Sequence, residues 1–515
     1  MNRHGICGES ASAPGCGWRR ALVAALTAAA LTGCAVGPDF RQPAAPTTNA
    51  YTAAPLSSET ASAPVTGGEA QRFVAGRDIP GQWWTLFHSP ALDRLVRQAL
   101  ADNPTLAAAQ ATLRQAQENL RALVGSALYP KVDGNASIVR QEIAGASFGQ
   151  PESGNSVFTL YNASVNVSYV LDLAGGARRE LEALQAQVDY QRFQLEGAWL
   201  TLTANLVTAA VQEGALRAQI RATREIVTEE EQQLALVDQQ FQLGGGSRPD
   251  VLAQEALLAQ TRATLPPLEK QLAQTRHLLA VLAGKPPGEG ALLPEFELTD
   301  LQLPRELPVS LPATLVRQRP DTRAAEELLH AACAQVGVAT ANLYPQLNIT
   351  GSIGSETDKI GNLFNAGTAV WSIGAGLAQP IFHGGELTAK RRAAIAAFDQ
   401  AEAQYRETLL QAFQNVADVL RALELDAQTL KAQADAEASA RASLDLARQQ
   451  FQLGAVSYIT LLNAERQHQQ SRLNLAQAQA ARHADTAALF KSLGGGWWNR
   501  EPDRDAATAS TKQKP

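Results

Sequence analysis

The second half of this chain repeats the first at a spacing of about 210 residues. The block Gln239–Gly244, with the sequence QQFQLG, recurs at Gln449–Gly454, and Leu128-Tyr129-Pro130 recurs as Leu343-Tyr344-Pro345. Each half has the same predicted order of parts: a helix, two short alternating strands, a very long helix, a glycine turn and a returning helix. A repeat of this size indicates one duplicated architecture rather than unrelated domains. Strand pairs bounded by such long helices favour a tube over an enzyme built around a pocket.

The composition predicts a mostly helical protein. Much of the apolar content is Ala and Leu, and Gln is abundant, and all three residues form helices readily. The formal net charge of −6 over 515 residues is mild and does not indicate the basic face that nucleic-acid binding needs.

Residues 1–33 resemble a bacterial lipoprotein signal peptide. Arg19-Arg20 supplies positive charge, residues 21–31 supply an apolar stretch too short to span a bilayer, and small residues precede Cys34. We therefore predict that Cys34 is lipidated and becomes the first mature residue. Ala35, rather than Asp, follows it, as in the outer-membrane sorting pattern. The alternative is an ordinary cleavable signal with an incidental cysteine.

The segment after the signal predicts a tether. Residues 34–82 are rich in Pro, Ala, Thr and Ser over most of their length, which suits an extended connection to a lipid anchor. Cys333 lies in an Ala-rich helical run and is interpreted as a small buried hydrophobe. With Cys34 lipidated, Cys333 has no partner for a disulfide.

Period-two alternation marks the candidate membrane strands. In residues 157–171 apolar side chains alternate with small polar ones, and similar patterns occur at 132–138, 347–353 and 369–377. A water-filled membrane barrel needs this alternation, although a half-buried soluble sheet has it too. Two strands per half give four per chain, whereas about eight are needed to close a barrel. Because open edges are excluded from lipid, several chains must share one barrel: two would give eight strands and three would give twelve.

Two very long helices are predicted, at about residues 177–243 and 386–453, and neither contains proline. At 1.5 Å per residue each is about 100 Å long. Apolar heptad ladders run along both, with Glu213 as the exception in the first and Glu402 and Glu437 in the second. Such ladders indicate sustained side-by-side helix packing. A simple coiled-coil rod would explain the ladders but neither the paired strands nor the duplication.

Glycine turns are predicted to close both long helices. Gly244 and Gly454 can adopt the left-handed conformation that ends a helix, and Ser247, Asp250 and Ser457 follow as candidate caps of the returning helices. Each half therefore contains a helical hairpin whose tip lies far from the strands. Residues 284–312, rich in Pro and Gly, are predicted as an irregular connection between the halves.

Four sequence blocks together resemble the TolC-type outer-membrane efflux factors, in particular the lipid-anchored group named after NodT. Each block is weak alone, but their order is specific, and they cover nearly the whole mature chain. They are Cys34–Phe40, Trp83–Phe87 with Asn103-Pro104, Arg319-Pro320-Asp321 followed by Tyr344-Pro345, and Gly494-Gly495-Gly496-Trp497.

This resemblance implies a mainly α, duplicated fold with four strands and long coiled-coil helices per chain. Three chains would form a homotrimer with a twelve-stranded outer-membrane barrel and an α-helical periplasmic barrel. The implied divisions are a first repeat at 83–283, an equatorial connection at 284–312, a second repeat at 313–493 and a C-terminal tail at 494–515.

The function implied is that of the outer-membrane channel of a tripartite efflux system. It would passively conduct small molecules or drugs that arrive from a periplasmic adaptor protein and an inner-membrane pump. A type I protein-secretion duct is the alternative cargo class. A non-conducting structural coiled-coil lipoprotein is the alternative from another class.

The resemblance also assigns the hairpin tips. Leu243 and Gly244, and Leu453 and Gly454, match the family's adaptor-contacting turns. The family's constriction has an apolar residue five positions after the second turn glycine and an acidic residue nine positions after it.

At those two positions this chain has Ile459 and Asn463, so a hydrophobic gate is retained but an acidic ring is not. Asp250 matches a family position that ties neighbouring helices through an ion pair. Since the matching partner position is Val456, that lock is predicted to be absent and Asp250 is interpreted as a helix cap.

No reactive constellation predicts an enzyme. The chain has no phosphate loop, no dinucleotide fingerprint and no Cys-x-x-Cys, and its seven His residues lack metal-ligand spacing. Its acidic residues lie mostly on helices among Arg and Gln and are interpreted as solvated faces. We therefore expect no catalytic residue, no cofactor and no metal.

Overall fold

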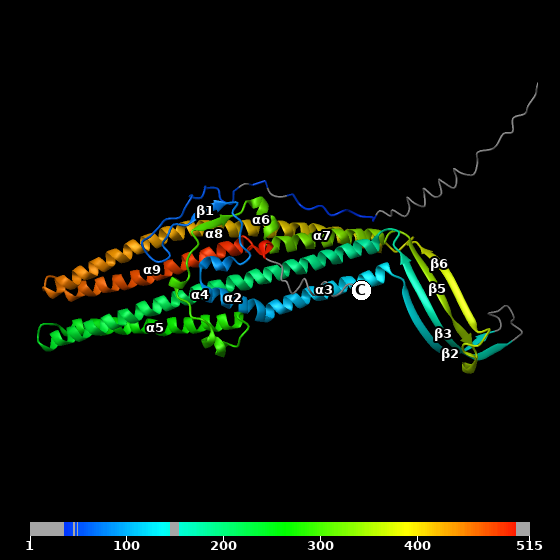
Figure 1. The fold of residues 1–515 in the computed structure, drawn as a ribbon, viewed down its shortest axis with the longest axis horizontal. Helices are drawn as coiled ribbons and strands as arrows, with labels where there is room; N and C mark the ends of the chain where they lie inside the picture. Colours follow the sequence, from blue (N-terminus) through cyan, green and yellow to red (C-terminus); the bar gives the residue numbers. More distant parts are fainter. Residues whose placement is uncertain (1–34, 45–46, 49, 145–153, 501–515) are drawn as a thin grey trace, which may run out of the picture. The chain divides into compact units, whose positions relative to one another are not determined.

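A computed structural model of the chain describes residues 35–44, 47–48, 50–144 and 154–500 (Figure 1). The described residues form two compact units, each assembled from three stretches of sequence. The strand unit comprises residues up to 41 together with 116–187 and 328–401, and the hairpin unit comprises 42–115, 188–327 and residues from 402 on. Cys34 lies outside the described residues.

The order of elements confirms the duplication. The first repeat runs α2, α3, β2, β3, α4, α5, and the second runs α6, α7, β5, β6, α8, α9 (Figure 1). Both α4 and α8 have 67 residues, and both α5 and α9 have 35. The bounds are α2 Pro90–Asp102, α3 Pro104–Leu128, β2 Lys131–Ala144, β3 Asn155–Leu171, α4 Gly176–Gln242, α5 Arg248–Leu282, α6 Pro312–Gln318, α7 Pro320–Ala341, β5 Gln346–Thr357, β6 Ala369–Ala378, α8 Glu386–Gln452 and α9 Tyr458–Ser492.

The strand unit holds one antiparallel sheet with the strand order β2-β3-β5-β6. All four strands occur where alternation predicts them. In this register, residues that pair across the sheet share a face. One row of paired residues is entirely polar and the adjacent row is mostly apolar. The polar row is Asp133, Asn166, Ser352 and Ser372, and the apolar row is Val132, Val167, Gly351 and Ile373.

The apolar face of this sheet is exposed in the single chain. Trp371 and Ile373 on β6 are 76% and 79% exposed, and Ile138 on β2 and Ile353 on β5 are each 66% exposed. Burying one large side chain is worth about 2 kcal/mol, so a sheet with such a face is not stable in water by itself. The face needs an apolar environment.

The core of the hairpin unit is built around tryptophan. A 3₁₀ turn at Trp83–Phe87 inserts Trp83, Trp84 and Phe87 fully among the helices, where the Trp83 ring stacks on Phe490 of α9 at 5.3 Å. The next helix, α2, begins with Ser89 as its cap and a proline in its first turn. These aromatic residues fix the first repeat to the end of the second.

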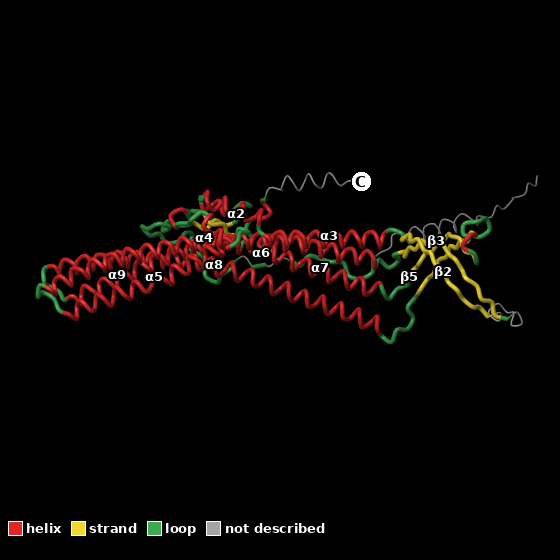
Figure 2. Tube along the Cα trace, turned by 90° about the horizontal axis from the view of Figure 1, so that it is seen from below, coloured by secondary structure: helices red, strands yellow, loops and turns green. Residues whose placement is uncertain are grey.

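Two helical hairpins extend from this core. Within the hairpin unit, α4 and α5 form hairpin one and α8 and α9 form hairpin two, and the two lie side by side with their turns at the same end (Figures 1 and 2). Along α8, Val416, Leu423 and Leu430, which are seven residues apart on the apolar ladder, are fully buried. Glu213, the exception on α4, is also fully buried and pairs with Arg217 at 2.9 Å and with Arg276 of α5 at 2.6 Å. The interpretation of acidic residues as solvated faces is therefore wrong for Glu213.

The stretch predicted as a tether has more structure than that prediction allows. Residues 72–75 form β1 (Arg72–Ala75), which pairs in parallel with β4 (Glu306–Val309) of the 284–312 connection. Thr60 and Gln71 are buried, and the Gln71 side chain donates to the Pro304 carbonyl at 3.0 Å. Polar side chains of this segment make the hydrogen bonds that water would otherwise make to backbone groups of the 284–312 connection. A composition rich in Pro and Thr therefore did not indicate an extended tether over this whole stretch.

Candidate functional site

The tips of the two hairpins have the same backbone hydrogen bonds. In hairpin one the Gly244 N–H donates to Phe241 and the Gly245 N–H to Gln240, at 3.0 and 2.8 Å. Hairpin two repeats both bonds from Gly454 and Ala455 at 2.9 and 2.8 Å. This is the Schellman closure, and it needs a left-handed residue, which Gly244 (φ 79°) and Gly454 (φ 71°) supply. Leu243 and Leu453, the residues just before these glycines, are 79% and 84% exposed.

The returning helices begin differently. Before α5, the Ser247 hydroxyl accepts from the Asp250 N–H at 3.4 Å, and the Asp250 carboxylate accepts from the Ser247 N–H at 3.2 Å, which completes a capping box. Before α9, Ser457 accepts from the Thr460 N–H at 3.4 Å without a reciprocal carboxylate. The Asp250 carboxylate therefore belongs to the cap of α5.

Ile459 and Asn463 lie one turn apart on α9, just after the tip of hairpin two. Both are exposed, whereas Tyr458, which precedes Ile459, and Leu461 and Leu462, which lie between the two, are buried against the other helices. The two predicted constriction residues therefore share the face of α9 that hairpin packing leaves uncovered.

Sequence reasoning missed the polar contacts between the two hairpins. The Tyr458 hydroxyl of α9 donates to the Gln254 side chain of α5, and Gln469 of α9 donates to the Glu230 carboxylate of α4. Thr261 of α5 also donates to Glu230, at 3.0 Å. No signal in the sequence marked these contacts, because Glu230 lies in the acidic run Glu229–Glu231.

Two buried carboxyl groups in this interface have raised pKa values. Burial raises the pKa of Glu465 on α9 to about 7; Arg448 opposes the shift, while Glu230 and Glu229 add to it. Burial also raises the pKa of Glu230, against hydrogen bonds from Thr261 and Gln469. Glu230 and Glu465 were wrongly interpreted as parts of solvated helix faces.

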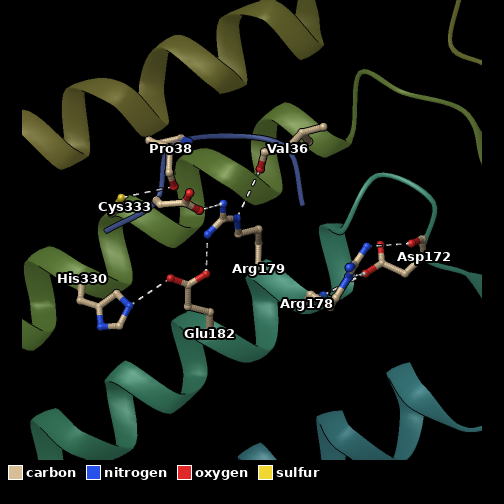
Figure 3. A network of polar contacts seen from close by, with 9 residues as sticks. Val36, Pro38, Asp172, Arg178, Arg179, Glu182, His330 and Cys333 are labelled. Carbon is tan, nitrogen blue, oxygen red and sulfur yellow. Dashed lines mark hydrogen bonds and ion pairs between the residues drawn. The ribbon is translucent and has the colours of Figure 1, made fainter. Parts of the chain in front are cut away.

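In the strand unit, the first described residues bind the beginning of α4 (Figure 3). The Val36 N–H donates to the Ala174 carbonyl at 3.0 Å, in the turn that directly follows β3. The guanidinium of Arg179 then contacts Val36 O at 3.3 Å and the Asp39 carboxylate at 2.6 Å. Residues 36–39 are thereby held at the end of the strands.

A second set of contacts continues this docking (Figure 3). Arg179 pairs with Glu182 at 2.7 Å, and His330 of α7 contacts the other oxygen of Glu182 at 3.0 Å. The Phe40 ring stacks on His330 at 4.3 Å. Burial alone would lower the pKa of Arg179, but Asp39 and Glu182 raise it, so the guanidinium remains cationic.

Cys333 of α7 is buried and contacts the Pro38 carbonyl at 3.7 Å, as a small packed side chain. Burial raises the pKa of its thiol. No cluster of three or more metal-ligating side chains occurs among the described residues. In that same part of the chain, none of the helices combines the length and the apolar character needed to cross a membrane.

Known proteins share this arrangement. The profile of the family described as "Outer membrane efflux protein" matches residues 95–285 and 311–495, which fall on the two repeats. The pyoverdine export outer membrane protein OpmQ of Pseudomonas putida is 32% identical over 454 residues, which are 86% of this chain and 94% of OpmQ. The toluene efflux pump outer membrane protein TtgC of Pseudomonas putida is 30% identical over 489 residues, covering 93% and 96% of the two chains. The solved outer-membrane channel OprN aligns with a TM-score of 0.81 at 28% identity, over 90% of this chain and 100% of OprN.

Proposed function

This chain belongs to the outer membrane efflux protein family and is an outer-membrane efflux channel, and we propose that it works as a lipid-anchored homotrimer in a tripartite efflux system. The observation that carries the proposal is the four-stranded sheet with two open edges. Among the described residues, β2 and β6 each pair on one side only. Unpaired backbone groups in lipid cost several kcal/mol each, so these edges must find partners.

Three copies satisfy this requirement. The β6 edge of one chain pairs with the β2 edge of the next, and four strands from each of three chains give a barrel of twelve. The exposed Trp371 and Ile373 then face lipid, and the row from Asp133 to Ser372 lines the lumen. Two copies would give only eight strands, whose interior is filled by side chains.

The docked residues 36–40 support a lipid anchor at Cys34. They place the start of the described chain beside the turn that ends β3, where a strand that spans the membrane would leave the bilayer. A lipid on Cys34 would therefore enter the membrane without strain. Mass spectrometry of the mature N-terminal peptide should show an acylated Cys34, and an unmodified N-terminus would refute the anchor.

The hairpin unit is then the periplasmic part of the channel. The exposed tips at Leu243, Gly244, Leu453 and Gly454 would contact the adaptor protein, which in turn joins an inner-membrane pump. Ile459 and Asn463 would form three-membered rings that close the resting channel and separate when an adaptor engages the tips.

The cargo proposed is small molecules. The names of OpmQ and TtgC refer to pyoverdine and toluene, two chemically unlike small molecules, which supports a passive duct over a selective one. The polar face of the sheet is mostly Asn, Ser and Thr along its paired rows, which suits a water-filled duct. A protein-secretion duct is less well supported by these names.

Two measurements on the detergent-solubilised protein test the proposal. Native mass spectrometry should give three copies per particle, and a conducting monomer would contradict the shared barrel. In planar bilayers the trimer should give discrete ion-conducting steps. A trimer that never conducts would favour the structural lipoprotein instead.

A further inference from the structure

Glu230 of α4 and Glu465 of α9 lie at the interface between hairpin one and hairpin two. They are only 3% and 7% exposed, and each has one carboxylate oxygen, Oε2, that is buried without a hydrogen-bond partner in the described part of the chain. Burying an ionised carboxylate without full hydrogen bonding is costly. Two such groups in one interface therefore call for a physical explanation.

The other oxygen of Glu230 joins three helices. It accepts from Thr261 of α5 at 3.0 Å and from Gln469 of α9, and Gln254 of α5 donates to the Glu230 backbone carbonyl at 3.3 Å. Gln254 in turn accepts from the Tyr458 hydroxyl of α9. These side chains connect hairpin one to hairpin two within a single protomer.

Two helices that pack against Glu465, α4 and α8, place charged side chains near its carboxylate. From α4, Glu229 and Glu230 face it, and from α8 the Arg448 guanidinium lies 4.0 Å from its Oε1 and 3.1 Å from Glu229. The α5 side chains on this side, Gln254 and Thr261, are uncharged.

The other charged groups near Glu465 interact with other partners. On α9, His468 contacts Glu437 of α8 at 3.3 Å, and Glu437 also pairs with Arg441 at 2.8 Å. Arg466 acts on Glu230 through its charge, and Asp250 of α5 acts on Tyr458. Arg448 and the three carboxylates of Glu229, Glu230 and Glu465 line a cavity of about 10 Å³, room for about one water molecule.

We propose that Glu230 and Glu465 form a proton-dependent clasp between the two hairpins, which sets how readily the periplasmic end of the channel opens. The proposal rests on the gate described above, because a clasp matters only if the hairpins must separate. When Glu465 carries a proton, the interface holds one fewer negative charge, and the carboxyl group gains an O–H that can donate a hydrogen bond within the interface. When Glu465 ionises, Glu229, Glu230 and Glu465 repel one another across the interface, and Arg448 and Arg466 offset this repulsion only in part.

The direction of the pH effect follows from linkage. In the packed interface the pKa of Glu465 is raised to about 7, against an ordinary value of 4.5. The packed state therefore binds the proton more tightly, and its advantage is present at low pH and lost as the pH rises through about 7. Between pH 6 and pH 8 the ratio of packed to separated hairpins should fall about tenfold per protomer.

The test uses the intact trimer and Glu465→Gln, which keeps the shape and removes the titration. Two readouts are followed from pH 6 to pH 8: resting conductance in planar bilayers, and amide hydrogen exchange of residues 444–469, corrected for the intrinsic pH dependence of exchange. In the wild type both should increase with pH by about tenfold or more. In Glu465→Gln both should be low and nearly independent of pH. Retention of the full pH response in this variant would overturn the clasp.

Asp485→Asn is the matched control. Asp485 is also on α9, and burial followed by its contact with Asp426 of α8 raises its pKa to about 7. That pair lies within hairpin two, so its removal should leave the pH response intact. Loss of the response in Asp485→Asn would assign it to a different group and overturn the proposal.

A second variant covers the case in which Glu465→Gln does not assemble. Glu230→Gln removes the opposing carboxylate, should lower the pKa of Glu465, and should shift the midpoint of both readouts to lower pH. An unshifted midpoint would contradict the clasp. If exchange depends on pH through Glu465 while conductance does not, the clasp stands and the gate at Ile459 and Asn463 is refuted.

Discussion

The two hairpins have the same length and the same tip hydrogen bonds, yet their sequences just beyond the tips have diverged. Hairpin one continues with Ser247, Pro249 and Asp250, which together form a capping box with a proline in the first turn. Hairpin two continues with Ser457, Tyr458 and Ile459, without an acidic cap. The capping box and Pro249 of hairpin one stiffen the start of α5. In hairpin two, the Tyr458 hydroxyl points toward hairpin one, and the Ile459 side chain is exposed.

This difference indicates separate roles for the two repeats. At the position that matches Ile459, hairpin one has Pro249, a short rigid ring in the first turn of α5. Hairpin two supplies Ile459 and Asn463 on its uncovered face and the titratable Glu465 on its covered face. We infer that hairpin one is the fixed support and hairpin two the element that moves.

Ile459→Ala gives the largest expected effect. Three Ile side chains at the axis of a trimer can exclude water and ions without charge, so their truncation should raise resting single-channel conductance several-fold. Pro249→Ala, five residues after Gly244 as Ile459 is after Gly454, should change it little. Equal effects in the two hairpins would show that the constriction is shared between them.

Asn463→Asp should change selectivity rather than size. A ring of three carboxylates attracts cations and can bind divalent ions, so cation preference should increase and divalent cations added on the periplasmic side should block. Leu252→Asp adds the same charge at an exposed position of hairpin one and should alter neither property. Unchanged reversal potentials in Asn463→Asp would place this residue away from the pore.

Much of the fold could be predicted because it rests on periodic patterns. The strands at 157–171 and 369–377 lie within one or two residues of β3 and β6, and the long helices end one residue before the predicted positions. Heptad repeats and period-two alternation indicate which face of a helix or strand is buried, and glycine indicates where a helix ends. Neither signal depends on which element packs against that face.

The clasp could not be predicted, because its meaning depends on which helices meet. Glu230 lies in the acidic run Glu229–Glu231, which resembles a solvated face in sequence, and only the packing of α9 against α4 buries it. The prediction of an extended tether at residues 34–82 was wrong in its folded part for the same reason. Gln71 and Thr60 are polar in sequence but are buried by hydrogen bonds to residues far along the chain.

Gly244→Ala and Gly454→Ala should have equal, moderate effects. No atom lies within 4 Å of a β-carbon at either position, so the cost is the left-handed backbone itself, about 1 kcal/mol per turn. This loss of stability should appear as faster amide exchange of the tip residues in both variants, while pore conductance stays unchanged. A larger effect in one hairpin would mean that its glycine has a contact in the assembled channel.

Asp250→Ala should have the smallest effect, confined to the start of α5. The Asp250 carboxylate accepts from the Ser247 hydroxyl at 2.6 Å and from its N–H at 3.2 Å, and loss of such a cap costs about 1 kcal/mol. Amide exchange of residues 248–252 should therefore accelerate about fivefold. Thr460→Ala, at the matching point of hairpin two, should change exchange less, because Thr460 makes no reciprocal bond to the Ser457 N–H. Resting conductance should stay low in Asp250→Ala, since Val456 offers this carboxylate no charge to pair with. A conductance increase comparable to that of Ile459→Ala would assign Asp250 to a lock and make hairpin one, too, part of the gate.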